Sequence, residues 1–63
     1  MNKLRFYRER KDYTQIDLAK MTGIPQAKIS RAENGVVELF GREWKVLADV
    51  LDCTVDELLG RSE

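Results

Sequence analysis

The sequence predicts an all-α fold in which five short helices pack into one compact domain. Apolar residues recur at intervals of three and four, as Trp44, Leu47 and Leu51 show most clearly. Residues that favour helix ends, such as Thr, Pro and Gly, separate these periodic segments. The expected helices span about residues 2–11, 15–21, 25–33, 42–51 and 55–59.

The length and composition predict a single domain, which we assign to residues 1–63. A chain this short buries roughly 60% of its unfolded surface, which leaves no room for a separate catalytic or ligand-binding domain. No apolar run approaches the ~20 residues of a membrane span, and no signal-peptide pattern opens the chain. With a single Cys53 and no His, we expect no disulfide, metal or cofactor and a reducing, cytoplasmic location.

The first helix is expected from about residue 2 to residue 11. Asn2 is a good N-terminal cap. Leu4 and Tyr7 are three residues apart and face inward, while Arg8 lies one step further and can bury its aliphatic stem. The first helix therefore contributes an apolar face that includes one arginine.

The second helix opens with a capping-box sequence at Thr14–Asp17, in which Asp replaces the usual Glu. Leu18 and Ala19 are its inward residues, and Met21 is a further candidate for burial. Gly23 follows the helix, and glycine tolerates the positive φ that a tight turn can require. The pattern thus predicts a short helix followed by a sharp turn.

The third helix starts at Pro25, whose fixed φ suits a first helical position, and it ends before Gly35. Ile29 and Ala32 face inward, and Glu33 joins them. Neither this helix nor the preceding one is long enough to bury a face alone, so the two must cross and share a core. Two short helices joined by a glycine turn are typical of a helix-turn-helix.

The fourth helix has a regular apolar face, and the fifth opens with a complete capping box at Thr54–Glu57. Gly60 closes the fifth helix. The inward residues of the two helices are Trp44, Leu47, Ala48, Leu51, Val55, Leu58 and Leu59.

Charge is distributed unevenly, although the formal net charge is zero. Residues 1–31 hold eight basic and three acidic groups, a balance of +5, whereas residues 32–63 hold three basic and eight acidic groups, a balance of −5. Such asymmetry points to an anionic partner on one face. Ordinary solvated helix surfaces would also produce it.

Taken together, these motifs resemble the phage repressor/Cro-like helix-turn-helix family, also called the xenobiotic-response-element type. The resemblance runs without gaps from Leu4 to Leu59. It rests on five segments in register: Leu4-Arg5 with Arg8, Thr14-Gln15 with Leu18-Ala19, the stretch Gly23–Gly35, Leu47-Ala48 with Leu51, and Val55–Leu59. It implies a sequence-specific transcriptional regulator, expected to be a repressor, that binds double-stranded DNA as a homodimer on a palindromic operator. It implies neither an enzyme nor a small-molecule ligand.

Carried over by position, the resemblance gives individual residues a role. The implied base contacts are Gln26, Ala27, Lys28 and Arg31. Gln15 would bond a phosphate and brace Gln26, and Arg8 with Glu33 would form an inward-facing ion pair. With the basic half of the chain considered as well, the expected backbone contacts are Gln15, Ser30, Lys20, Arg10 and Lys11.

The side chains predicted to face the major groove suit base edges. Arg or Lys can fork onto guanine, Gln onto adenine, and a short Ala can meet a thymine methyl group. An alternative interpretation without DNA contact remains open, in which Gln26, Lys28 and Arg31 are only the polar face of an amphipathic helix. No Gly-rich phosphate loop or separate carboxylate pair supports an enzyme.

The connection after Gly35 departs from the family pattern, which often has basic residues there. Val36, Val37, Leu39 and Phe40 are apolar instead. They form either a dimer or partner surface or local packing beneath the loop. The alternative function is therefore a protein-interaction module on the same fold, such as an antitoxin or accessory factor, that uses residues 36–40.

Overall fold

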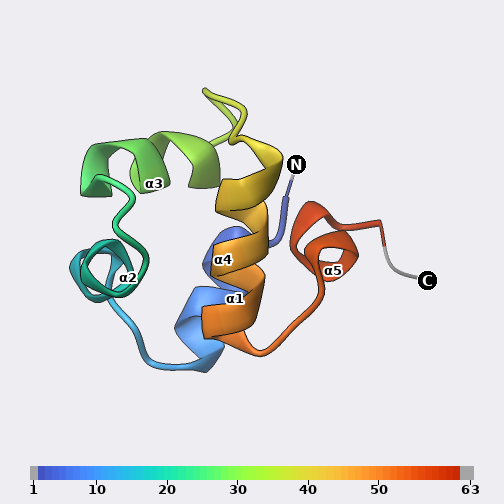
Figure 1. Ribbon diagram of the computed structural model, residues 1–63, viewed down its shortest axis with the longest axis horizontal. Coiled ribbons are helices and arrows are strands. Elements are labelled where there is room, and N and C mark those ends of the chain that lie inside the picture. The colour runs from blue at the N-terminus through green and yellow to red at the C-terminus, as the bar shows by residue number, and fades with distance from the viewer. Residues whose placement is uncertain (1, 62–63) are drawn as a thin grey trace.

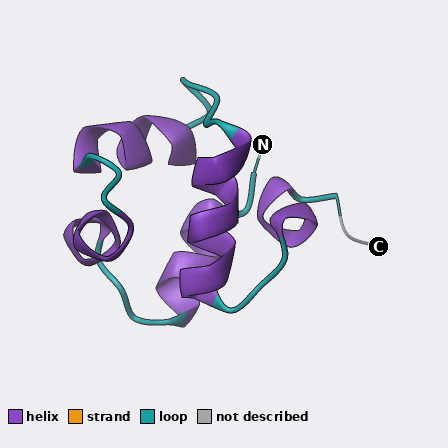
Figure 2. Ribbon diagram, in the orientation of Figure 1, coloured by secondary structure: helices purple, strands orange, loops and turns teal. Residues whose placement is uncertain are grey.

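Of the five α-helices within residues 2–61, α4 lies at the centre, with α2 and α3 on one side and α5 on the other (Figure 1). The computed structural model describes residues 2–61, and this part of the chain contains helices and loops but no strand (Figure 2). The predicted all-α fold is confirmed; residues 1, 62 and 63 of the predicted domain lie outside the described residues. The helices are α1 (Leu4–Arg10), α2 (Gln15–Thr22), α3 (Gln26–Glu33), α4 (Gly41–Leu51) and α5 (Val55–Leu59).

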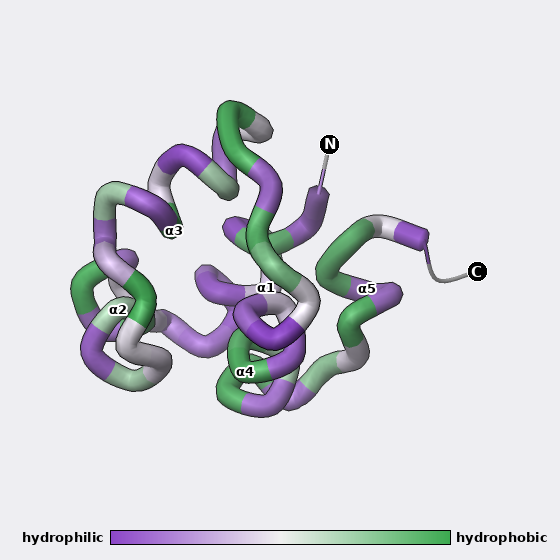
Figure 3. Tube along the Cα trace, turned by 45° about the horizontal axis from the view of Figure 1, so that its top comes forward, coloured by the Kyte–Doolittle hydropathy of each residue, from purple (hydrophilic) through white to green (hydrophobic). Residues whose placement is uncertain are grey.

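Every helix contributes one fully buried aliphatic side chain to a single core. These side chains are Leu4, Leu18, Ile29, Leu47 and Leu58. Each contributes about 1.5–3 kcal/mol through burial. Apolar and polar stretches alternate along the helices in Figure 3, as expected when each helix turns one face to this core. No helix within residues 2–61 combines the length and apolar character needed to cross a membrane.

Helix α1 begins at Leu4, two residues later than predicted, and its N-cap is Lys3 in place of the expected Asn2, whose side chain makes two bonds. Its Oδ1 accepts the Leu4 N–H at 3.0 Å, and its Nδ2 donates to the Ala32 carbonyl at 2.8 Å. The Lys3 N–H donates to the Leu58 carbonyl at 2.7 Å. Residues 2–3 therefore tie the start of α1 to α3 and α5 instead of extending the helix.

The predicted capping box of α2 is present. The Thr14 Oγ1 accepts the Asp17 N–H and the Asp17 carboxylate accepts the Thr14 N–H, both at 2.9 Å. The bond that the Thr14 N–H donates to the carboxylate is the main cause of a lowered pKa for Asp17, followed by the Thr14 side chain. At the other end Gly23 has φ +78°, the left-handed conformation that glycine adopts readily. Burial of Met21 was a wrong expectation, because its side chain points outward and is 46% exposed.

Helix α3 begins at Gln26, one residue later than predicted. Pro25 has an extended ψ of 140°, so it precedes the first turn as the N-cap. At the C-terminal end Gly35 has φ +73°, and the Val36 N–H donates to the Arg31 carbonyl at 2.8 Å. This is the bonding pattern of a Schellman motif, which ends the helix sharply.

Helix α4 begins one residue earlier than predicted, at Gly41, because the Glu43 carboxylate accepts the Phe40 N–H at 2.8 Å. Its predicted apolar face is confirmed, with Trp44 and Leu47 in the core. The predicted capping box of α5 is also present between Thr54 and Glu57. These local bonds fix the first turns of α4 and α5.

Candidate nucleic-acid interface

Helix α3 buries one side and exposes the other. Ile29, Ala32 and Glu33 are buried, whereas Ala27 and Arg31 are exposed. At about 100° per residue, Ala27 and Arg31 lie near the middle of the exposed side. They are four residues apart, so their side chains are neighbours along the helix.

The two remaining predicted base contacts lie at opposite edges of this exposed side. Gln26 and Lys28 are about 160° apart around an ideal helix axis. Gln26 is on the edge next to α2, where its Nε2 donates to Gln15 Oε1 at 3.4 Å. Lys28 is on the edge next to α4, where its Nζ donates to Glu43 Oε2 at 2.8 Å. The expectation that Gln26, Lys28 and Arg31 line one face is therefore wrong, because Gln26 and Lys28 lie on opposite edges with Arg31 between them.

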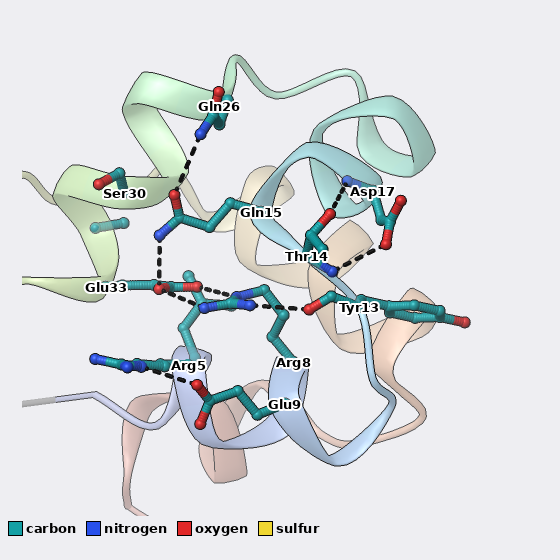
Figure 4. A network of polar contacts seen from close by, with 12 residues as sticks. Arg5, Arg8, Glu9, Tyr13, Thr14, Gln15, Asp17, Gln26, Ser30 and Glu33 are labelled. Atoms are coloured by element: carbon teal, nitrogen blue, oxygen red, sulfur yellow. Dashed lines mark hydrogen bonds and ion pairs between the residues drawn. The ribbon is translucent and has the colours of Figure 1, made fainter.

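A chain of hydrogen bonds runs from Gln26 into the interior of the domain (Figure 4). The Gln15 Nε2 donates to Glu33 Oε1 at 3.0 Å. Arg8 donates two hydrogen bonds to the same carboxylate, from Nε at 2.6 Å and from Nη2 at 3.1 Å. Arg8 Nη1 also donates to the Tyr13 carbonyl at 2.8 Å. The start of α2 and the start of α3 are thereby fixed to one buried carboxylate.

Arg8 and Glu33 form the inward-facing ion pair between α1 and the end of α3. Their side chains are only 11% and 3% exposed. The hydrogen bonds that Arg8 donates to the Glu33 carboxylate raise the pKa of Arg8 against the opposing effect of burial. Because charges removed from water need partners, this forked pair is the arrangement that permits burial. Its role is to organise the domain and position Gln15.

Lys28 makes two contacts with the start of α4. Besides the bond to Glu43, its ammonium lies 4.8 Å from the centre of the Phe40 ring. The Lys28 hydrogen bond is the main cause of a lowered pKa for Glu43, followed by the bond from the Phe40 N–H. Sequence reasoning missed Glu43, since a contact between residues so far apart requires knowing how α3 and α4 approach each other.

Ser30 and Arg31 complete the outward side of α3. Ser30 is half-buried and lies on the same side as Gln15 and Gln26 in Figure 4. Arg31 is exposed, and within residues 2–61 it makes no ion pair. Its guanidinium therefore has all of its donors available to an external acceptor.

The structure does not bring Arg10, Lys11 and Lys20 to α3, so the backbone contacts predicted for them remain predictions and would lie away from that helix. The C-terminal end of α1 lies at the opposite end of the molecule from α3 (Figure 1). There Lys11 pairs with Asp52, and the Arg10 guanidinium lies 5.4 Å from the centre of the Tyr7 ring. Lys20 is about 140° from Gln15 around α2 and lines a hollow with Tyr13, Asp17 and Met21.

A family model described as helix-turn-helix matches residues 4–58. This chain belongs to the Cro/C1-type helix-turn-helix family. The family consists of DNA-binding regulator domains and is not an enzyme family. A comparison with curated proteins finds no match. The chain is therefore a DNA-binding helix-turn-helix domain in which α2, the turn at Gly23 and α3 form the motif.

In this helix-turn-helix domain the apolar connection between α3 and α4, residues 36–40, is only partly exposed. Leu39 is buried in the core and Val37 packs against it, so the assignment of Leu39 to an exposed partner surface is wrong. Leu39 is buried because the chain turns inward between the end of α3 and the start of α4. Val36 and Phe40 remain exposed, at 70% and 60%. The candidate partner surface is thus reduced to these two residues.

Proposed function

We propose that this helix-turn-helix domain is a sequence-specific transcriptional repressor that inserts α3 into the major groove of double-stranded DNA in the cytoplasm. The exposed side of α3 supports this most directly, because Ala27 and Arg31 project from it while the opposite side is held in the core. The major groove is wide enough to admit an α-helix.

The proposed base and phosphate contacts follow from the positions of the side chains on α2 and α3. Arg31 forks onto a guanine, Ala27 meets a thymine methyl group, and Gln26 reads an adenine in the orientation that Gln15 supports. Gln15 and Ser30 bond phosphates at the edge next to α2. Phosphate contacts fix the register of the helix, while the base contacts select the sequence.

Selection from random duplex DNA, followed by gel retention against excess bulk DNA, tests this function. The expected result is an enriched motif that retains the protein when bulk DNA is added. The protein-interaction alternative expects no enriched motif and no retention. Uniform loss of the complex to bulk DNA would therefore contradict the proposal.

An Arg31→Ala variant is expected to lose discrimination at one base pair in each half-site. A forked arginine–guanine contact is worth about 1–3 kcal/mol of discrimination, whereas a phosphate contact weakens all sequences about equally. Binding-site selection with the variant measures this. Arg10→Ala is the matched control, because Arg10 lies at the end of α1 away from α3 and should leave every position unchanged. If Arg31→Ala merely bound more weakly with the same motif, Arg31 would be a phosphate contact.

We also expect two protomers to bind one palindromic operator. One recognition helix reads only a few base pairs, and two helices placed ~34 Å apart reach successive major-groove faces. The exposed Val36 and Phe40 and the end of α5 are the proposed contacts between protomers. Analytical ultracentrifugation with labelled DNA should show two protomers on a full site. Specific, saturable binding of one protomer to an isolated half-site would show that the dimer is not needed.

A further inference from the structure

The contacts of Lys28 form a small cluster at the junction of α3 and α4. One oxygen of Glu43 accepts the Lys28 ammonium at 2.8 Å, and the other accepts the Phe40 N–H at 2.8 Å. The Phe40 ring lies 4.8 Å from the ammonium. The cluster is partly shielded from water, with the Lys28 and Glu43 side chains 30% and 16% exposed.

This cluster holds the Lys28 side chain on the edge of α3 next to α4. To reach a base edge, the ammonium would have to leave both the carboxylate and the aromatic ring. Glu43 cannot follow it, because its second oxygen is committed to the first turn of α4 through the Phe40 N–H. The contact is therefore anchored by α4 and not by two freely moving side chains.

We propose that Glu43 is a specificity-determining positioning residue that keeps Lys28 from reading a base. In this arrangement Gln26, Ala27 and Arg31 alone read the half-site. The sequence-based prediction of Lys28 as a base contact would then be wrong. The inference rests on the proposed function, since it concerns how that same face of α3 reads DNA.

Bound DNA strengthens this arrangement. If Lys28 moved to a base, Glu43 would be left as an unpaired carboxylate beside a polyanion. The negative potential of the phosphates makes that state costly. The pair leaves Lys28 and Glu43 together with no net charge, so it adds little to the attraction between the protein and the DNA backbone.

Three variants test the inference by binding-site selection and affinity measurement. Lys28→Met keeps a long side chain against Phe40 but removes the ammonium. It should retain the wild-type motif at every position while binding all sequences more weakly, because Glu43 loses its partner beside the DNA. Glu43→Gln can still accept the Phe40 N–H but weakens the hold on Lys28. It should gain a guanine preference of roughly fivefold or more at one new position in each half-site. The double variant should lose that new preference.

The outcomes separate the inference from the proposed function. If the wild-type protein selects a motif and Lys28→Met loses one position of it, Lys28 reads a base and the inference is wrong. An unchanged motif for Glu43→Gln would also overturn it. If the wild-type protein selects no motif, the proposed function itself fails. Circular dichroism verifies that each variant is folded, and Lys28→Met alone decides the question if Glu43→Gln is not.

Discussion

A Glu33→Ala variant is expected to lose about 3–5 kcal/mol of stability. The substitution leaves the Arg8 guanidinium buried without its carboxylate and removes the acceptor of Gln15. At about 0.05–0.15 kcal/mol per residue, a domain of this length has a total stability of only roughly 3–9 kcal/mol. Urea titration followed by circular dichroism should therefore show a midpoint shifted far toward zero denaturant, and a largely unfolded variant if the wild-type stability lies at the lower end of that range.

Two controls distinguish this effect from general loss of a charge. Glu9→Ala removes an exposed ion pair with Arg5, whose side chains are 56% and 71% exposed, and it should cost no more than about 0.5 kcal/mol. The double variant Arg8→Met with Glu33→Leu replaces both charges and should recover a large part of the loss. A Glu33→Ala protein that melted within a few degrees of wild type would contradict the role of the pair.

Affinity for the selected operator is expected to fall steeply with salt, although the chain carries no net charge. In the proposed complex only the face around α3 meets phosphates, so the charges on that face, and not the net charge of the chain, determine the salt dependence. If Arg31 and Arg42 of both protomers displace counterions, the slope of log affinity against log salt is about −3.6, at about −0.9 per charge. The affinity should then drop on the order of 10²-fold between about 50 and 200 mM salt. Fluorescence anisotropy across this range measures it.

The salt dependence of two variants, one at an arginine and one at a lysine, tests where the phosphate contacts lie. Arg42 is exposed at the start of α4 and lines a hollow with Gly23 and Pro25 of the turn before α3. Arg42→Gln should make the slope shallower by about 2, because a dimer loses two contacts. Lys11→Gln should leave it unchanged, because Lys11 is paired with Asp52 at the far end of α1. An affinity that did not respond to salt would exclude α3 as the DNA-binding face.

Most of the fold could be predicted because local patterns determine it. The Thr14–Asp17 and Thr54–Glu57 capping boxes locate the starts of α2 and α5, and the Trp44–Leu51 spacing defines the core face of α4. The errors lie where a long-range contact decides a local boundary. Asn2 bonds the Ala32 carbonyl and precedes Lys3, which is the N-cap of α1. Glu43 bonds the Phe40 N–H and starts α4 earlier.

The candidate site was harder to predict from the sequence than the fold was. Position along a helix placed Ala27 and Arg31 on the outward side of α3, but it could not show what lies beside each edge. The partner of Lys28 is fifteen positions away, and Leu39 is buried by a turn of the chain that no periodicity describes. Charge alone also grouped Lys11 with the DNA face, although α1 carries it to the other end of the molecule.

The bond between Gln15 and Gln26 has a consequence for the entropy of binding. A glutamine side chain free in water samples many rotamers, and ordering such a side chain at an interface costs about 0.5–1.5 kcal/mol. Gln15 is itself held by the buried Glu33, so the conformers open to Gln26 are already restricted before DNA arrives. In the proposed complex, part of the ordering that the adenine contact of Gln26 requires would thus take place during folding. The rigid interior of the domain would then lower the entropic cost of reading a base at its surface.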